Sequence, residues 1–290
     1  MTYRTVANIL PAHPLQMGVL TVYQPLPTQR VDQIDPFLLL HHFGPVEVKA
    51  GGRDPLDVGP HPHRGFEPVT FLYQGGIRHR DSRDNTGHLR AGDVQWMTAG
   101  RGIIHSERGS REFMEAGGTL EGIQLWVNLS PEHKMVQPRY QDLKADTIPR
   151  VDLGDGASLR IVAGNFGGLA GAAQTHGAVL AWQLSLPPGV SIDLPVPEAY
   201  NLAAYLLDGG VAGSSGFENP ARTLLHYLND GTGIHLTNTA QTPARVLVLG
   251  GEPIGAPVVS HGPFVMNDQT QIMEAMRDYK MGKMGFYVEE

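Results

Sequence analysis

Short apolar segments separated by turn residues recur along the whole chain, and this pattern constrains the fold more than any other feature. The turns draw on 36 glycines and 22 prolines among 290 residues. Many short strands at such spacing are typical of a β-sandwich or a β-barrel. The sequence therefore predicts an all-β protein. Its candidate strands are Val19–Tyr23, Phe37–Leu40, Val69–Tyr73, Val94–Met97, Ile123–Val127, Leu159–Val162, Val179–Leu184, Leu202–Leu207 and Arg245–Leu249.

The two halves of the chain carry a similar segment. His61–Gly76 ends with three apolar residues, a polar residue and two glycines, and Pro195–Gly210 does the same 134 positions later. Both segments read as a strand that enters a glycine turn. We therefore expect two similar all-β barrels in one chain, with the proline- and charge-rich passage Ser130–Arg150 connecting them.

At the matched offsets, the second half lacks the polar groups of the first. In the second half, Pro195 stands at the position of His61, Pro197 at that of His63 and Asn201 at that of Glu67. Residues 1–135 are accordingly predicted to form a metal-binding barrel, and residues 150–265 a barrel without metal. Residues 266–290 are predicted to form a helix and a tail that pack across the barrels.

The C-terminal helix has recognisable ends. Asn267 or Asp268 can cap its start, and Gly282 can stop it. Its predicted apolar stripe consists of Ile272, Met273, Met276 and Tyr279.

Charge and composition exclude several classes of protein. The net charge is −7 without any run of like charges, so no direct binding of nucleic acid is expected. The chain has no cysteine, which rules out disulfides and thiolate ligands. The first residues lack the pattern of a signal peptide, and no stretch approaches the ~20 apolar residues that cross a bilayer. We therefore expect a cytoplasmic protein that does not bind membranes.

Two pairs of polar residues have the spacing of metal ligands on strands. In a strand, residues i and i+2 point to the same face, so His61 projects with His63, and His105 projects with Glu107. Two such pairs on neighbouring strands would converge on one point. Imidazole and carboxylate ligands suit Fe(II), Mn(II), Co(II), Ni(II), Cu(II) or Zn(II), and the lack of sulfur argues against a structural zinc site. The sequence predicts one divalent metal ion per chain.

An isolated histidine is usually structural, so the remaining histidines need separate treatment. They have no paired partner, and we interpret them as structural or solvent-exposed. His41 and His42 are adjacent and would point to opposite faces of a strand. The residues in this class include His41, His42, His79, His88 and His133.

Several motifs resemble those of the pirin family, a branch of the cupin superfamily. The two segments that carry the paired residues, HPHRGFEPVTFL and GDVQWMTAGRGIIHSE, resemble the metal-binding segments of that family. Further matches are DPFLLLHHFGP, LWVNL, PRYQ and GEPIGAPVVSHGPFVMN, so the resemblance runs from about Asp35 to the C-terminus. It implies a bicupin, in which two antiparallel β-barrels of jelly-roll type are present and only the N-terminal one holds a metal, usually iron. The family's ligands fall on His61, His63, His105 and Glu107.

Glu67 completes the spacing H-x-H-x3-E, which is the general cupin pattern and often makes that glutamate a ligand. The pirin branch takes its carboxylate from the second segment instead. We therefore assign Glu107 to the metal and expect a supporting or structural role for Glu67.

The resemblance implies two functions from different classes. The first is a quercetin 2,3-dioxygenase type of enzyme that opens the central ring of flavonols with dioxygen, with Glu107 as the catalytic base. The alternative is an iron-binding, redox-sensing regulator that binds a transcription factor or a metabolic enzyme. The chain has no basic localisation run, which favours the enzyme, with a flavonol-like small molecule and dioxygen as its partners.

Overall fold

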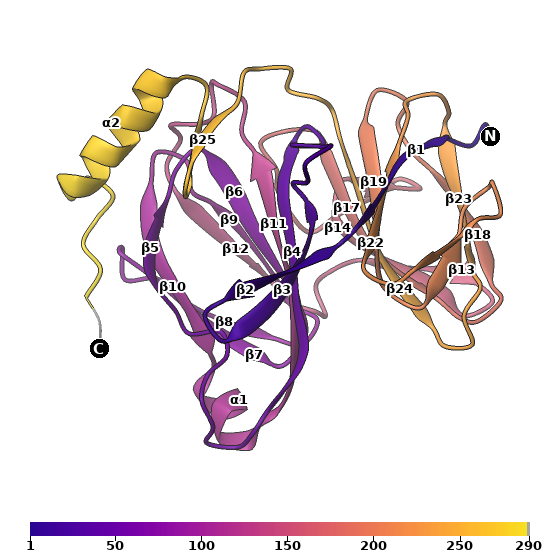
Figure 1. Cartoon of the computed structure of the whole chain (residues 1–290), viewed down its shortest axis with the longest axis horizontal. Helices are drawn as coiled ribbons and strands as arrows, with labels where there is room; N and C mark the ends of the chain where they lie inside the picture. The colour runs from indigo at the N-terminus through magenta and orange to yellow at the C-terminus, as the bar shows by residue number, and fades with distance from the viewer. Residues whose placement is uncertain (289–290) are drawn as a thin grey trace. The chain divides into compact units, whose positions relative to one another are not determined.

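The computed structural model describes residues 1–288, and it divides them into two compact units. The N-terminal unit, as we call it, comprises 14–22, 37–145 and the described part of 254–290. The C-terminal unit comprises 1–13, 23–36 and 146–253. Each unit is built almost entirely of antiparallel strands (Figure 1). The predicted all-β bicupin architecture is confirmed.

The N-terminal unit has one seven-stranded and one four-stranded sheet. The larger sheet has the order β12 (Arg139–Leu143), β9 (Val94–Thr98), β6 (Phe66–Gln74), β11 (Gly118–Asn128), β4 (Phe37–Val48), β3 (Leu20–Leu26) and β2 (His13–Met17). The smaller sheet has the order β5 (Val58–His63), β10 (Ile103–Gly109), β7 (Gly76–Asp81) and β8 (Thr86–Arg90). A hairpin of β25 (Val259–His261) and β26 (Phe264–Met266) belongs to the same unit.

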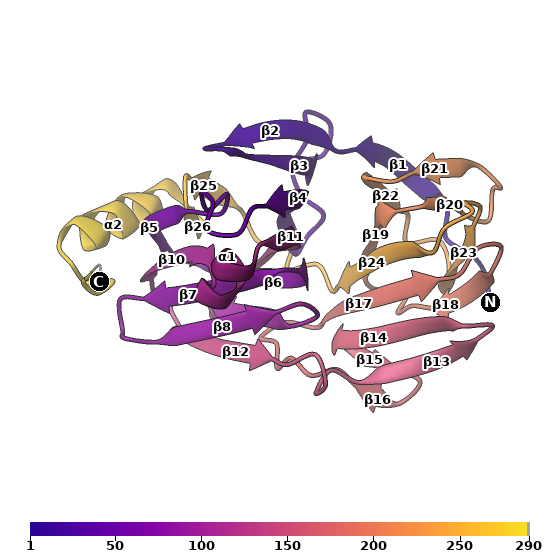
Figure 2. The same cartoon turned by 90° about the horizontal axis from the view of Figure 1, so that it is seen from below.

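The C-terminal unit repeats this topology strand for strand (Figure 2). Its larger sheet has the order β1 (Val6–Pro11), β22 (Thr223–Tyr227), β19 (Asn201–Asp208), β24 (Ala244–Gly251), β17 (Val179–Leu186), β14 (Ala157–Ala163) and β13 (Arg150–Gly154). Its smaller sheet has the order β18 (Ser191–Pro195), β23 (Gly233–Asn238), β20 (Gly210–Ala212) and β21 (Glu218–Pro220). The short strands β15 (Asn165–Phe166) and β16 (Leu169–Ala170) form a separate hairpin. Eight of the nine predicted strand segments lie within strands, and the ninth, Val19–Tyr23, starts one residue before β3.

The glycine turns that suggested the duplication occupy equivalent places. Gly75 (φ 92°) and Gly209 (φ 78°) each follow a strand of the larger sheet, in a backbone conformation that favours glycine. Gly76 and Gly210 then begin the next strand, β7 or β20. The repeat detected in the sequence is therefore a repeat of structure.

The two ends of the chain belong to other units than the predicted residue ranges gave them. Strand β1 pairs with β22, which places the first residues in the C-terminal unit rather than in 1–135. The passage Ser130–Arg150 is more than a connection, since it contains β12, which pairs with β9. In both units the outermost position of the larger sheet is thus filled by a strand that the apolar pattern did not reveal.

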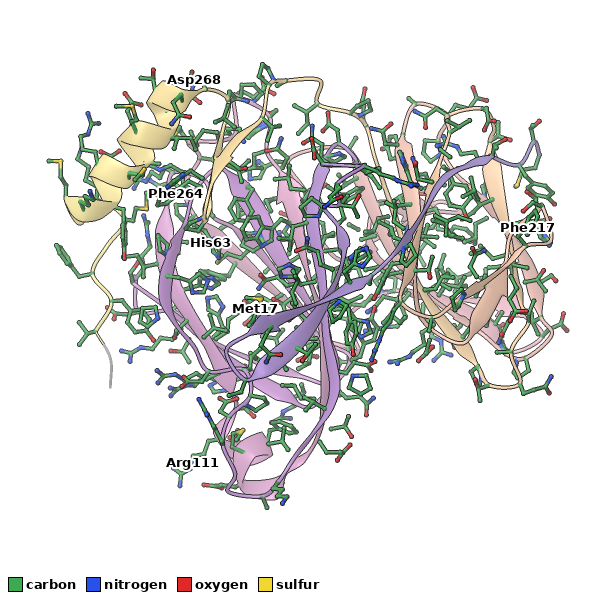
Figure 3. All side chains as sticks on the ribbon, viewed as in Figure 1. Met17, His63, Arg111, Phe217, Phe264 and Asp268 are labelled. Carbon is green, nitrogen blue, oxygen red and sulfur yellow. The ribbon has the colours of Figure 1, made fainter. Side chains whose placement is uncertain are left out.

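The C-terminal helix α2 (Gln269–Lys280) begins at its N-cap Asp268, whose side chain accepts a hydrogen bond from the Gln271 N–H. Ile272 is buried as predicted, whereas Met273 is 63% and Tyr279 39% exposed, so the predicted stripe is wrong at those two positions. The helix contacts β25 and β26 within the N-terminal unit. Figure 3 labels Asp268 at the start of this helix and Phe264 on β26.

A short helix, α1 (Arg111–Ala116), follows β10 and was not predicted. Ser110 caps its start by accepting a hydrogen bond from the Phe113 N–H, and Gly117 (φ 73°) ends it. Its six residues are too few to give a periodic apolar pattern, which explains why the sequence did not reveal it. No helix among residues 1–288 is long and apolar enough to cross a membrane.

Candidate metal centre

Strands β5 and β10 are hydrogen-bonded neighbours, and their pairing brings the predicted residues together. His105 lies directly opposite His61 in the antiparallel register. The rings of His61, His63 and His105 have centroids 4.3–4.8 Å apart, and one nitrogen from each lies within 4.8 Å of the others. Three of the four residues in the two inferred pairs therefore converge, as expected for neighbouring strands.

Glu107 lies beside this cluster rather than at its centre. Its carboxylate belongs to a second group with the same 4.8 Å limit, formed with His105 and His79. Thr70 donates a hydrogen bond to its Oε1 at 3.3 Å, and Gln124 donates one to its Oε2 at 3.1 Å. Burial raises the pKa of the Glu107 carboxyl. His105 is the one residue that the two groups share.

The nitrogen atoms of the histidines meet the requirements of a divalent metal. His61 Nδ1 lies 2.9 Å from the Gly59 carbonyl oxygen, to which it donates, and this leaves the Nε2 lone pair free. That Nε2 is 3.0 Å from His63 Nε2. Two nitrogens bound at right angles to one ion, each at about 2.1 Å, would be about 3 Å apart. The spacing fits ligands on adjacent corners of an octahedron.

An unpartnered buried atom supports the same conclusion. Among the residues that the structure describes, His105 Nε2 is buried and has no hydrogen-bond partner. A buried polar atom of that kind calls for an explanation, and an absent ion supplies one. Burial also lowers the pKa of His63 and of His105 well below the usual range, so both rings are neutral and able to donate a lone pair.

Glu67 faces a different set of partners. It belongs to neither ligand group, and its Oε1 accepts a 2.6 Å hydrogen bond from Thr98 on β9. Burial raises its pKa to about 7. This position agrees with the supporting role expected for Glu67.

A cavity of about 650 Å³ is lined by three of the four candidate ligands, namely His61, His63 and Glu107. Its wall is largely apolar, and that wall includes Leu20, Val22, Leu39, Phe43, Leu56 and Trp126. Its other polar residues include Thr70, Gln124, Arg53, Asp54 and Asp57. Figure 3 labels His63 within this unit and Met17, another residue of the lining, at the end of β2. An apolar cavity of this size with a few convergent polar groups is typical of a site for a small organic molecule.

Two histidines that were interpreted as structural or exposed lie at this site. His41 lines the cavity, and burial lowers its pKa to about 4. His79 is buried, with its Nδ1 3.3 Å from His105 Nδ1. The test that identified the ligands also applies to His79, because it forms a same-face pair with Asp81 directly after a glycine turn.

Comparisons with known proteins cover both units. Residues 19–127 match the family model described as Pirin, and residues 181–285 match the Pirin C-terminal cupin domain. A pirin-like protein of Solanum lycopersicum is 42% identical over 260 residues, which cover 88% of this chain and 84% of the relative. A Pseudomonas aeruginosa protein named "Putative quercetin 2,3-dioxygenase" is 41% identical, with 86% of each chain covered. The crystal structure of quercetin 2,3-dioxygenase from Acinetobacter baumannii superposes with a TM-score of 0.92 at 36% identity, covering 98% of this chain and 99% of that one.

Proposed function

Because the chain belongs to the pirin family and carries both of its domains in order, we propose that it is a metal-dependent dioxygenase that opens the central ring of flavonols. The observation that carries the proposal is the position of His61, His63 and Glu107 in the lining of a largely apolar cavity of about 650 Å³. The names of the Pseudomonas and Acinetobacter relatives support the same reaction class.

The proposed ligands are His61, His63, His105 and Glu107, and the proposed ion is Fe(II). Bound there, a redox-active divalent ion with open coordination positions supplies the site at which an oxygen-donor substrate and dioxygen meet. Mn, Co, Ni, Cu and Zn share the preference for imidazole and carboxylate, so the experiment below compares them.

The cavity wall selects the substrate by its chemistry. A flavonol is a flat aromatic molecule with one polar edge, formed by a hydroxyl next to a ketone. Its aromatic rings are complementary to the apolar wall of Leu39, Phe43 and Trp126. Its polar edge is complementary to His61, His63 and Glu107 in the same lining.

Glu107 has the surroundings of a general base. Thr70 and Gln124 each hold one of its carboxylate oxygens, which fixes the plane of the carboxylate. In the proposed reaction it accepts the proton of the flavonol hydroxyl, and the resulting anion is the species that dioxygen oxidises.

The test is anaerobic removal of metal followed by reloading with Fe(II), and in parallel with each of the other divalent ions. Oxygen uptake and loss of flavonol absorbance are then followed together. We expect metal-dependent consumption of oxygen and flavonol in equal amounts. A fully loaded protein that consumes no oxygen with any flavonol or related enediol would overturn the proposal and favour the regulatory alternative.

A further inference from the structure

His79 lies next to the proposed ligand His105 and contacts its Nδ1 atom. Its Nδ1 is 3.3 Å from His105 Nδ1, and its Nε2 is 3.1 Å from the Tyr140 hydroxyl. The Asp81 carboxylate, on the same strand as His79, interacts with the Tyr140 hydroxyl. His79 and Asp81 are buried. Side chains from strands β10, β7 and β12 thus form one continuous row of polar contacts.

The direction of each hydrogen bond follows from the metal site of the proposed function. A metal on His105 takes the lone pair of the unpartnered Nε2, so the one proton of that neutral ring is on Nδ1. His105 Nδ1 therefore donates to His79 Nδ1. His79 then carries its own proton on Nε2 and donates it to the Tyr140 hydroxyl oxygen.

Tyr140 and Asp81 support this arrangement from the other end. The Tyr140 hydroxyl that accepts from His79 keeps its own proton to donate, and the Asp81 carboxylate interacts with that hydroxyl. Asp81 is itself held in place by hydrogen bonds from the backbone N–H of Arg83 at 2.7 Å and from Asn85 Nδ2 at 2.8 Å.

We propose that His79, Tyr140 and Asp81 form a relay, here called the His79 relay, that holds His105 in the tautomer and orientation needed to bind the metal. The proposal rests on the metal site of the proposed function. His79 is a positioning residue, since it touches the ligand and not the reacting atoms. Such a partner raises the basicity of the ligand nitrogen and limits rotation of its ring.

Metal affinity provides the first test. We expect His79→Leu to weaken the binding of Co(II) about 10–100-fold, because His105 loses its acceptor. His79→Asn keeps an amide oxygen close to the place of Nδ1, and it should restore most of the affinity and the wild-type Co(II) absorption spectrum. His88→Leu, which alters an exposed histidine on the neighbouring strand β8, is the matched control and should bind Co(II) normally. Melting curves of the metal-free variants show whether each one is folded.

Histidine tautomers in the metal-free protein provide the second test, by long-range ¹H–¹⁵N correlation spectra. We expect His105 to carry its proton on Nδ1 and His79 on Nε2, and His79→Leu to remove this preference in His105. A proton on His105 Nε2 in the wild type would overturn the relay. So would unchanged Co(II) affinity in His79→Leu, or an Asn variant no better than the Leu variant.

These readouts separate the relay from the proposed enzyme. A wild-type protein that binds Co(II) through the relay, but consumes no oxygen with flavonols, refutes the dioxygenase and leaves the relay intact. A wild-type protein that binds no divalent ion refutes both.

Discussion

The two units share one topology but fill their interiors with opposite chemistry. Ile77 of β7 pairs with Gly109 of β10, and His105 lies four residues before Gly109. In the same way, Val211 of β20 pairs with Asn238 of β23, and Ile234 lies four residues before Asn238. The counterpart of His105 in the C-terminal unit is therefore a buried isoleucine.

The other proposed ligands have apolar counterparts as well. Leu194 lies opposite Ile234, as His61 lies opposite His105, and two residues further on Val196 takes the place of His63. Leu236 corresponds to Glu107. Leu194, Val196, Ile234 and Leu236 are all buried in the core of the C-terminal unit. The sequence match had predicted Pro195 and Pro197 at the histidine positions, one residue later, because the connection from β18 to β19 is longer than that from β5 to β6.

This comparison shows what the histidine cluster demands of the fold. In the C-terminal unit the sheet interior is closed by aliphatic side chains, which stabilise it by being removed from water. In the N-terminal unit the same positions hold imidazoles and a carboxylate, which are stable when buried only with partners. Function and stability therefore make opposite demands on two copies of one architecture, and the following predictions test this difference.

The largest effect is expected for the metal itself. Metal analysis should give one ion per chain, and His63→Ala should abolish stoichiometric binding because it removes a ligand from a cluster of few groups. His235→Ala, in the C-terminal unit, is the matched control and should retain one ion. Two ions in the wild type, or full metal content in each single variant of His61, His63, His105 and Glu107, would contradict the contrast between the units.

Catalysis should depend on the carboxylate that only the N-terminal unit has. Glu107→Gln keeps the size of the side chain but removes the base, so turnover per bound iron should fall about 10²–10⁴-fold. The Michaelis constant for the flavonol should change much less. Rates are normalised to iron content, and full activity per iron would remove Glu107 from the mechanism.

Exchanging the two kinds of interior should affect stability unequally. Ile234→His places an unpartnered imidazole in a closed core, and it should lower the free energy of unfolding by about 2–4 kcal/mol. His105→Leu removes the unpartnered Nε2 but also leaves His79 Nδ1 without its donor, so the stability of the metal-free protein should change by no more than about 2 kcal/mol. Urea unfolding of the metal-free variants measures both. A large loss of stability in His105→Leu would show that the histidine is needed for the fold.

The smallest effect concerns Glu67, whose counterpart Asn201 is neutral. The two residues correspond because Glu67 pairs with Val127 and Asn201 pairs with Gly251. Burial raises the pKa of Glu67 to about 7, so the folded protein binds more protons than the unfolded chain between its ordinary pKa and that value. Its contribution to stability therefore decreases as the pH rises through this window, by no more than about 3 kcal/mol.

Glu67→Gln should remove that decrease. The difference in urea midpoint between variant and wild type should grow from pH 5 to pH 7.5 and then level off. Taking the difference cancels the histidines, whose lowered pKa values act in the opposite direction below pH 6.5. A difference that stays constant with pH would show that Glu67 is ionised throughout.

The sequence predicted the fold class and the three-histidine cluster because both depend on local periodicity. Spacing of two residues on a strand identified His61 with His63, and the glycine turns identified the repeat. The edge strands β1 and β12 were missed because each has only one buried residue, which weakens the apolar pattern. His79 was missed because its importance depends on the pairing of β7 with β10, which the sequence of either strand alone does not specify.

The exchange of chain ends between the units has a consequence for synthesis on the ribosome. Strand β1 is made some two hundred residues before its partner β22, so the C-terminal unit cannot complete its sheet early. The N-terminal unit waits longer still, since its hairpin β25–β26 and helix α2 follow β24 in the chain. Arg64, next to His63, is held by Asp278 of that helix at 3.2 Å. The segment that carries two of the proposed ligands thus gains this support only after α2 has emerged, so we expect nascent chains that end before residue 254 to capture metal poorly.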